Sequence, residues 1–180
     1  DLSAIRVSCE NLCPELKWED LMVPYGAVLA AKQAWPSLVA LRKTQLQSAQ
    51  DERRFELRRE IANIFYEHLN QLSDAAELYE NILRHSPADG EIRDKLIEIY
   101  QTTDNTDDLA KLYIFLAQTL DEENNSSHWI IRAASLYGDT LKDPGAAEQA
   151  LRHYCHSKKT NQADTDLLSC LEDFECFDLV

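Results

Sequence analysis

The chain has 180 residues, of which 44% are hydrophobic and 28% charged, close to the proportions of an average globular protein. It carries 18 Lys and Arg against 32 Asp and Glu, a formal net charge of −14 at pH 7. Residues 1–60 are balanced, with nine basic and nine acidic side chains, so residues 61–180 hold the whole excess of acid. Such a surface repels phosphate backbones and anionic headgroups. The composition excludes collagen-like and disordered classes and argues against nucleic-acid or membrane partners.

Glycine and proline are scarce, with four and five residues, so the chain has few tight turns and an all-α protein is predicted. The most apolar stretch, residues 21–41, is broken by two prolines and by Lys32 and Gln33, which argues against a membrane span. Five cysteines without regular spacing indicate reduced thiols and a cytoplasmic protein: Cys9, Cys13, Cys155, Cys170 and Cys176.

In chain order, residues 1–20 are interpreted as an N-terminal helical extension. Apolar side chains then recur with helical spacing, and the segments are separated by polar turn residues. They predict helices at about 25–34, 36–49, 51–69, 74–85, 89–102, 106–121, 126–141, 144–157 and 164–176.

An internal repeat links these helices in pairs. In each of three units an aromatic residue is followed ten residues later by an alanine: Phe65 and Ala75, Tyr100 and Ala110, Tyr137 and Ala147. A polar turn lies between each aromatic and its alanine. Alanine at a helix crossing lets the two backbones approach, and the aromatic fills the space beside it. Because neither helix can bury its apolar stripe alone, the units must stack, which predicts an α-solenoid of antiparallel helix pairs.

The predicted boundaries place a degenerate unit at 21–50 and clearer units at 51–88, 89–125 and 126–160. Residues 161–180 are interpreted as the start of a further unit or as a capping helix. They end on apolar Phe177, Leu179 and Val180, so we expect the chain to continue, or a partner to bind, at that end.

The repeat resembles the tetratricopeptide (TPR) family, and long bacterial TPR arrays in particular. The first clear unit carries the resemblance at Ala62, Phe65, Ala75, Tyr79 and Pro87, the second at Ile97, Tyr100, Ala110 and Ala117, and the third at Ala134, Tyr137, Ala147 and Leu151. The sequence departs from the family pattern in a longer turn between the helices and in a single closing proline. The resemblance implies a TPR-like superhelix that serves as a scaffold for protein–protein interaction.

The family resemblance also implies a peptide-binding groove, because the first helices of successive TPR units line a concave surface. Carried over unit by unit, the basic and amide positions of that surface fall on Arg59, Asn63, Lys95, His128 and Arg132. Arginine can hold a carboxylate by two hydrogen bonds, and lysine attracts it as a point charge. The alternative is that these side chains only pair with neighbouring acids, which would contribute little stability. Trp18, Trp35 and Trp129 are likewise either core residues or anchors for a peptide.

Signals for catalysis are weak. No phosphate-binding loop, G-x-S-x-G or H-E-x-x-H motif occurs. His153, Cys155 and His156 are close in sequence, but neighbouring helical residues diverge by about 100°, which favours a polar helix end over a metal or nucleophile site.

The sequence therefore predicts a non-catalytic adaptor that binds a protein or peptide and needs no metal or cofactor. Two alternatives stay open: a regulatory arm packed against a catalytic domain elsewhere, and a structural subunit of a larger assembly.

Overall fold

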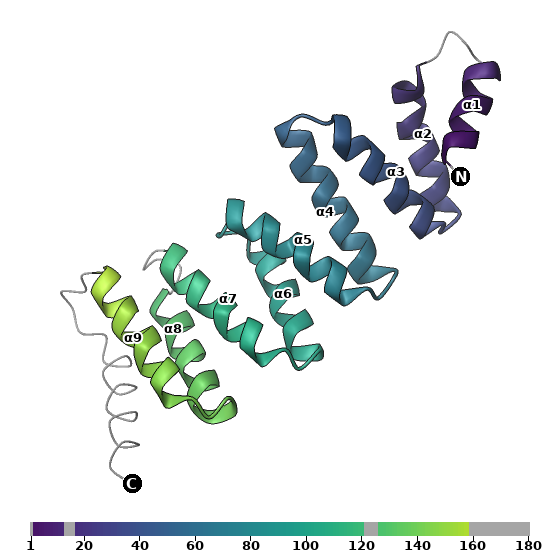
Figure 1. The fold of residues 1–180 in the computed structure, drawn as a ribbon. Helices are drawn as coiled ribbons and strands as arrows, with labels where there is room; N and C mark the ends of the chain where they lie inside the picture. The colour runs from purple at the N-terminus through teal and green to yellow at the C-terminus, as the bar shows by residue number, and fades with distance from the viewer. Residues whose placement is uncertain (1, 13–16, 121–125, 159–180) are drawn as a thin grey trace, which may run out of the picture. The chain divides into compact units, whose positions relative to one another are not determined.

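The computed structural model describes residues 2–12, 17–120 and 126–158, and within these ranges every regular element is helical (Figure 1). The predicted all-α class is therefore confirmed for the described part of the chain. The chain divides into two compact units, residues 1–82 and residues 83–180.

Unit 1 contains α1 (Leu2–Leu12), α2 (Trp18–Ala31), α3 (Trp35–Ser48), α4 (Asp51–Glu67) and most of α5 (Leu72–His85). α3 packs against both α2 and α4, and α1 contacts α2 and α3. Its core includes Leu41, Leu57 and Ile61, each at most 1% exposed.

The structure corrects the predicted start of the second helix. We expected it to begin near residue 25, but α2 begins at Trp18 and Pro24 lies inside it. A proline at the seventh helical position costs one backbone hydrogen bond. The buried side chains of Trp18, Met22 and Leu29 lie on both sides of Pro24, and their burial offsets that cost.

Unit 2 contains α6 (Gly90–Thr102), α7 (Thr106–Thr119), α8 (Ser126–Ser135), a π-helical segment η2 (Leu136–Thr140) and α9 (Pro144–Lys158). α8 packs against α7 and α9, and α6 packs against α7. The single helix expected at 126–141 is thus an α-helix whose last turn widens. There the N–H of Leu141 donates to the carbonyl of Leu136, five residues back, at 3.0 Å.

The backbone repeats the same turn at four helix junctions, two in each unit. A residue with a positive φ of 51–56° ends each first helix: Gln33, Asn70, Asp104 and Lys142. The N–H of the following residue then donates at 2.9 Å to a carbonyl of that helix, from Leu29, Phe65, Tyr100 and Tyr137 respectively. The aromatic residue found by sequence comparison therefore also marks where the first helix closes, in three of the four junctions.

The second helices begin in register after these turns. We call the residue directly after each positive-φ residue the junction residue: Ala34, Gln71, Asn105 and Asp143. Its carbonyl accepts the first hydrogen bond of the second helix from the N–H four positions later, which belongs to Leu38, Ala75, Leu109 or Ala147 respectively. In the unit that begins at α6 the structurally equivalent residue is therefore Leu109, one position before Ala110. The reason is a shorter turn: the junction residue follows Tyr100 by five positions, but follows Phe65 and Tyr137 by six.

Lys142 is the least suited of the four turn residues to a left-handed backbone, because its long side chain gains no local hydrogen bond there. We expect Lys142→Gly to raise the free energy of unfolding by about 0.5–1 kcal/mol, since glycine adopts positive φ without strain. Denaturant titration measures the change. Lys32→Gly, at a helix end with φ of −86°, is the control and should not stabilise.

The residues predicted to pack the repeat are mostly buried. Ala75, Ala110 and Ala147 are fully buried, Phe65 and Tyr100 are 8% and 5% exposed, and Tyr137 is half-buried. No helix in the described part of the chain is long and apolar enough to cross a membrane.

Candidate functional site

The five residues predicted to line a groove fall in both units. Arg59 and Asn63 lie on α4 in unit 1, whereas Lys95 lies on α6 and His128 and Arg132 lie on α8 in unit 2.

In unit 1, the side chain of Asn63 makes a hydrogen bond inside the helix packing. Its side-chain oxygen accepts a hydrogen bond from the hydroxyl of Tyr79 on α5 at 2.8 Å. Tyr79 is fully buried, so this bond satisfies a polar group that has no access to water. Arg59 is half-buried on the same helix and also has an interaction within the chain.

In unit 2, Lys95 bonds along its own helix. Its ammonium nitrogen lies 3.1 Å from a carboxylate oxygen of Glu91, four residues earlier. An ion pair of this kind contributes only a few tenths of a kcal/mol to a helix. It matches the alternative in which Lys95 pairs with a neighbouring acid.

His128 and Arg132 belong to a group of cations and aromatic rings, which we call the Trp129 cluster: Arg93 of α6, Tyr113 of α7, and His128, Trp129 and Arg132 of α8. Trp129 is at its centre, 8% exposed. The guanidinium carbons of Arg93 and Arg132 lie 5.2 and 6.0 Å from the centre of the Trp129 ring. Both distances are within the range of a cation–π interaction.

Tyr113 completes the cluster. Its ring centre lies 5.5 Å from that of Trp129, and the guanidinium of Arg132 lies 5.6 Å from the Tyr113 ring. Arg132 therefore contacts two aromatic rings while its own side chain is exposed. These contacts hold the guanidinium in place and reduce the entropy that it would lose on binding a ligand.

The two arginines differ in their charge partners. The side chain of Arg93 bonds to the carboxylate of Asp94 at 3.0 Å. Among the described residues Arg132 has cation–π contacts but no carboxylate partner. The indole N–H of Trp129 is also buried without an acceptor from this part of the chain. The cluster thus combines an exposed, positioned cation with an unused hydrogen-bond donor, and both would suit an oxygen acceptor.

Burial raises the pKa of Tyr113 above its usual value of 10.0, and the positive charge of Arg132 lowers it in part. The folded protein therefore retains the phenolic proton at pH values where the unfolded chain has lost it. We expect the free energy of unfolding to fall as pH rises above 10, because the unfolded state then binds fewer protons. Denaturant titrations at pH 8–11 measure this slope, which Tyr113→Phe should make shallower; an unchanged slope would assign the loss to other groups.

Sequence reasoning missed Arg93 and Tyr113. The repeat pattern places Lys95 at a groove position of α6. Arg93 lies about 200° away around the same helix, so it faces a different neighbour. Only the packing of α6 and α8 against α7 brings Arg93, Tyr113 and Trp129 together. A sequence signal for this contact would have required knowing which helix faces meet.

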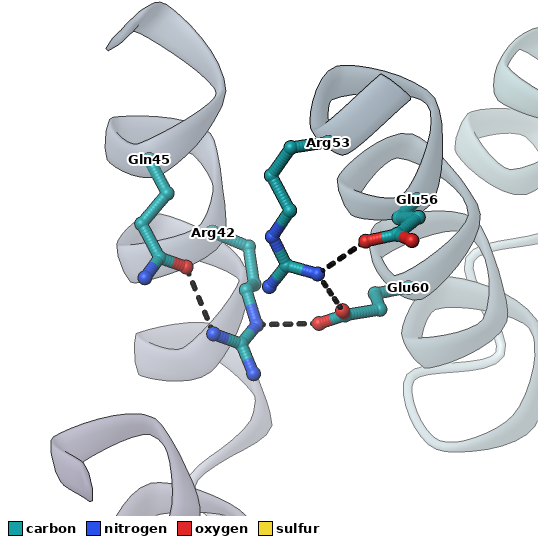
Figure 2. Close-up of polar contacts among 5 residues, drawn as sticks. All are labelled: Arg42, Gln45, Arg53, Glu56 and Glu60. Atoms are coloured by element: carbon teal, nitrogen blue, oxygen red, sulfur yellow. Dashed lines mark hydrogen bonds and ion pairs between the residues drawn. The ribbon is translucent and has the colours of Figure 1, made fainter. Parts of the chain in front are cut away.

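Unlike Arg132, Arg53 of α4 is paired with carboxylates of its own helix, as Figure 2 shows. One nitrogen of Arg53 lies 2.7 Å from Glu56 and 3.4 Å from Glu60. Glu60 also lies 2.7 Å from Nε of Arg42 on α3, and Arg42 donates a hydrogen bond to Gln45 at 2.8 Å. Arg42, Gln45, Arg53, Glu56 and Glu60 form what we call the α3–α4 network. The two arginine charges are balanced by Glu56 and Glu60 within unit 1, although the buried Nε–H of Arg42 is not aligned for a hydrogen bond to Glu60. The network therefore has a structural role.

The other tryptophans are engaged inside unit 1. Trp18 is 6% exposed, and the centre of its ring lies 6.4 Å from that of Tyr25. Trp35 is half-buried and stacks on the imidazole of His68, with ring centres 3.7 Å apart and planes 7° apart. Trp35 and His68 thus connect the start of α3 to the end of α4.

The residues considered for metal binding or catalysis lie largely outside the described side chains: His153 is exposed on α9, and the side chains of Cys155 and His156 are not described. Among the described residues, no three His, Cys, Asp or Glu side chains gather so that they could hold a metal ion. Comparison of the chain with protein-family models, with curated proteins and with solved structures gave no match.

Proposed function

We propose that the protein is a non-catalytic interaction module that binds an acidic peptide segment of a partner protein through the Trp129 cluster. The proposal keeps the TPR-like scaffold that the repeat resembles, and it places the module in the cytoplasm. The single observation that supports it most is Arg132, an exposed guanidinium set against two aromatic rings with no carboxylate from the described residues.

The charge of the chain explains why such a cation would be selective. Residues 83–180 carry more acidic than basic side chains, so a peptide carboxylate is attracted where cations are concentrated and repelled where acids are. Arg132 can hold a carboxylate by two parallel hydrogen bonds, which lysine cannot do. Trp129 and Tyr113 provide apolar area beside it, as aromatic anchors do in protein interfaces.

The proposal is tested with an immobilised library of ten-residue peptides rich in Glu and Asp, beside the same peptides with Gln and Asn in their place. The wild-type protein should retain a subset of acidic peptides and lose them in the amide library. Arg132→Glu should weaken that binding at least tenfold, because it reverses the charge at the contact.

Lys142→Glu is the matched control, an exposed cation of the same unit outside the Trp129 cluster. Loss of peptide binding in Lys142→Glu but not in Arg132→Glu would move the binding surface to the turn before α9. Equal retention of both libraries, or none of either, would contradict the proposal and favour the alternative of a structural or regulatory arm within a larger protein or assembly.

A further inference from the structure

Beside α9 lies an open groove with a volume of about 810 Å³, which we call the α9 groove. It is lined by Ala146, Gln149, Ala150 and His153 of α9, together with Ile114 of α7 and Tyr137 of η2. Ala146 and Ala150 are one helical turn apart, so the wall along α9 is shallow there and a second helix could approach closely. The groove belongs wholly to unit 2 and is separate from the Trp129 cluster.

The α9 groove carries little charge although unit 2 is acidic. Glu148 and Arg152, which also line it, form an ion pair at 2.5 Å and neutralise one another. His153 is the remaining ionisable side chain of α9 in the wall. The wall of the groove therefore has no net negative charge that would repel an acidic segment.

Residues 159–180 follow α9 in the sequence and lie outside the described part of the chain. Their sequence has a strongly amphipathic pattern from Asp164 onward. In helical register one face would carry only apolar side chains and a cysteine: Leu167, Cys170, Leu171, Phe174 and Phe177. Residues 161–180 hold six acidic and no basic side chains. Cys176 falls on the opposite, polar face.

We propose that residues 164–178 of the chain dock as a helix in its own α9 groove. The apolar face would cover Ala146, Ala150 and Ile114, and the acidic face would point to solvent. About five residues, 159–163, connect the segment to the end of α9, a usual length for the link between antiparallel helices. The same face would otherwise leave two phenylalanines and two leucines in water.

The two cysteines of the segment provide the test in the full chain. Docking buries Cys170 and leaves Cys176 exposed, so a thiol reagent should modify Cys170 at least tenfold more slowly than Cys176 in native conditions. Mass spectrometry of the digested protein assigns the modified positions. Equal rates at the two positions would overturn the proposal.

Variants of the groove wall show whether the protection comes from this site. Ala150→Glu places bulk and a negative charge where the segment would lie, and it should raise the rate at Cys170 to that of Cys176. His153→Glu adds the charge at an exposed position, without the steric change, and should act in the same direction. Gln101→Glu, exposed on α6 and not among the residues that line the groove, is the matched control and should leave Cys170 protected. Protection that survives both groove variants would place the segment elsewhere.

A second copy of the chain could supply the segment in place of the same copy. The rate at Cys170 is therefore measured over a hundredfold range of protein concentration, with light scattering to follow the mass. A constant rate in a monomer supports docking within one chain. Protection that appears only as dimers form would overturn it.

Discussion

Replacing Ala110 with leucine is expected to lower the free energy of unfolding by about 2–3 kcal/mol, because it forces an extra side chain into a filled helix contact. Ala110 is fully buried near the start of α7, between residues that are themselves 5% and 3% exposed, Leu109 and Tyr113. α7 packs against both α6 and α8, so neither side offers room for a branched side chain. Denaturant titration, with the slope compared between variants, measures the loss.

The matched control is Gln118→Leu, which adds the same side chain to the exposed face of the same helix. Surface changes of this kind usually shift stability by no more than about 0.5 kcal/mol. If Ala110→Leu were as well tolerated as Gln118→Leu, a small residue would not be needed where the helices meet. The packing explanation for Ala110 would then be wrong.

The helical class and the turns could be predicted because both depend on local sequence. Asn70 and Asp104 adopt the left-handed backbone that their short polar side chains favour, and the structure places turns there. The same local reasoning failed at Pro24, where burial of nearby apolar side chains outweighs a poor helix former. It did not foresee η2 either, since the apolar spacing of residues 126–141 fits one continuous helix and π turns are rare.

The candidate site was only partly accessible from the sequence. Repeat register identifies His128 and Arg132 on α8, and the structure places both at Trp129. The same register cannot show that Asn63 hydrogen bonds to Tyr79, or that Arg93 approaches Trp129 from another helix. Those contacts depend on which faces of α4 and α5, or of α6 and α8, meet in space. A single sequence does not show which helix faces are in contact.

Replacing Glu60 with leucine is expected to cost about 1–2 kcal/mol of unfolding free energy, because it removes the acid that Arg42 and Arg53 share in the α3–α4 network (Figure 2). The two arginines should not suffer equally. The Arg42 side chain is 16% exposed, whereas that of Arg53 is 46% exposed and also has Glu56. Water can replace the lost contact at Arg53, but Arg42 retains a largely buried charge with only Gln45 beside it.

This difference makes the double variant informative. Adding Arg42→Met to Glu60→Leu removes the stranded charge and leaves two apolar side chains that can pack between α3 and α4, so stability should recover by about 1 kcal/mol or more. Adding Arg53→Met instead should recover little, since an exposed ion pair contributes less. Equal recovery in both double variants would mean that burial of Arg42 does not set the cost of losing Glu60. Recovery confined to Arg42→Met would show that Glu60 is retained to neutralise a charge between two helices, and that a purely apolar contact could replace the pair.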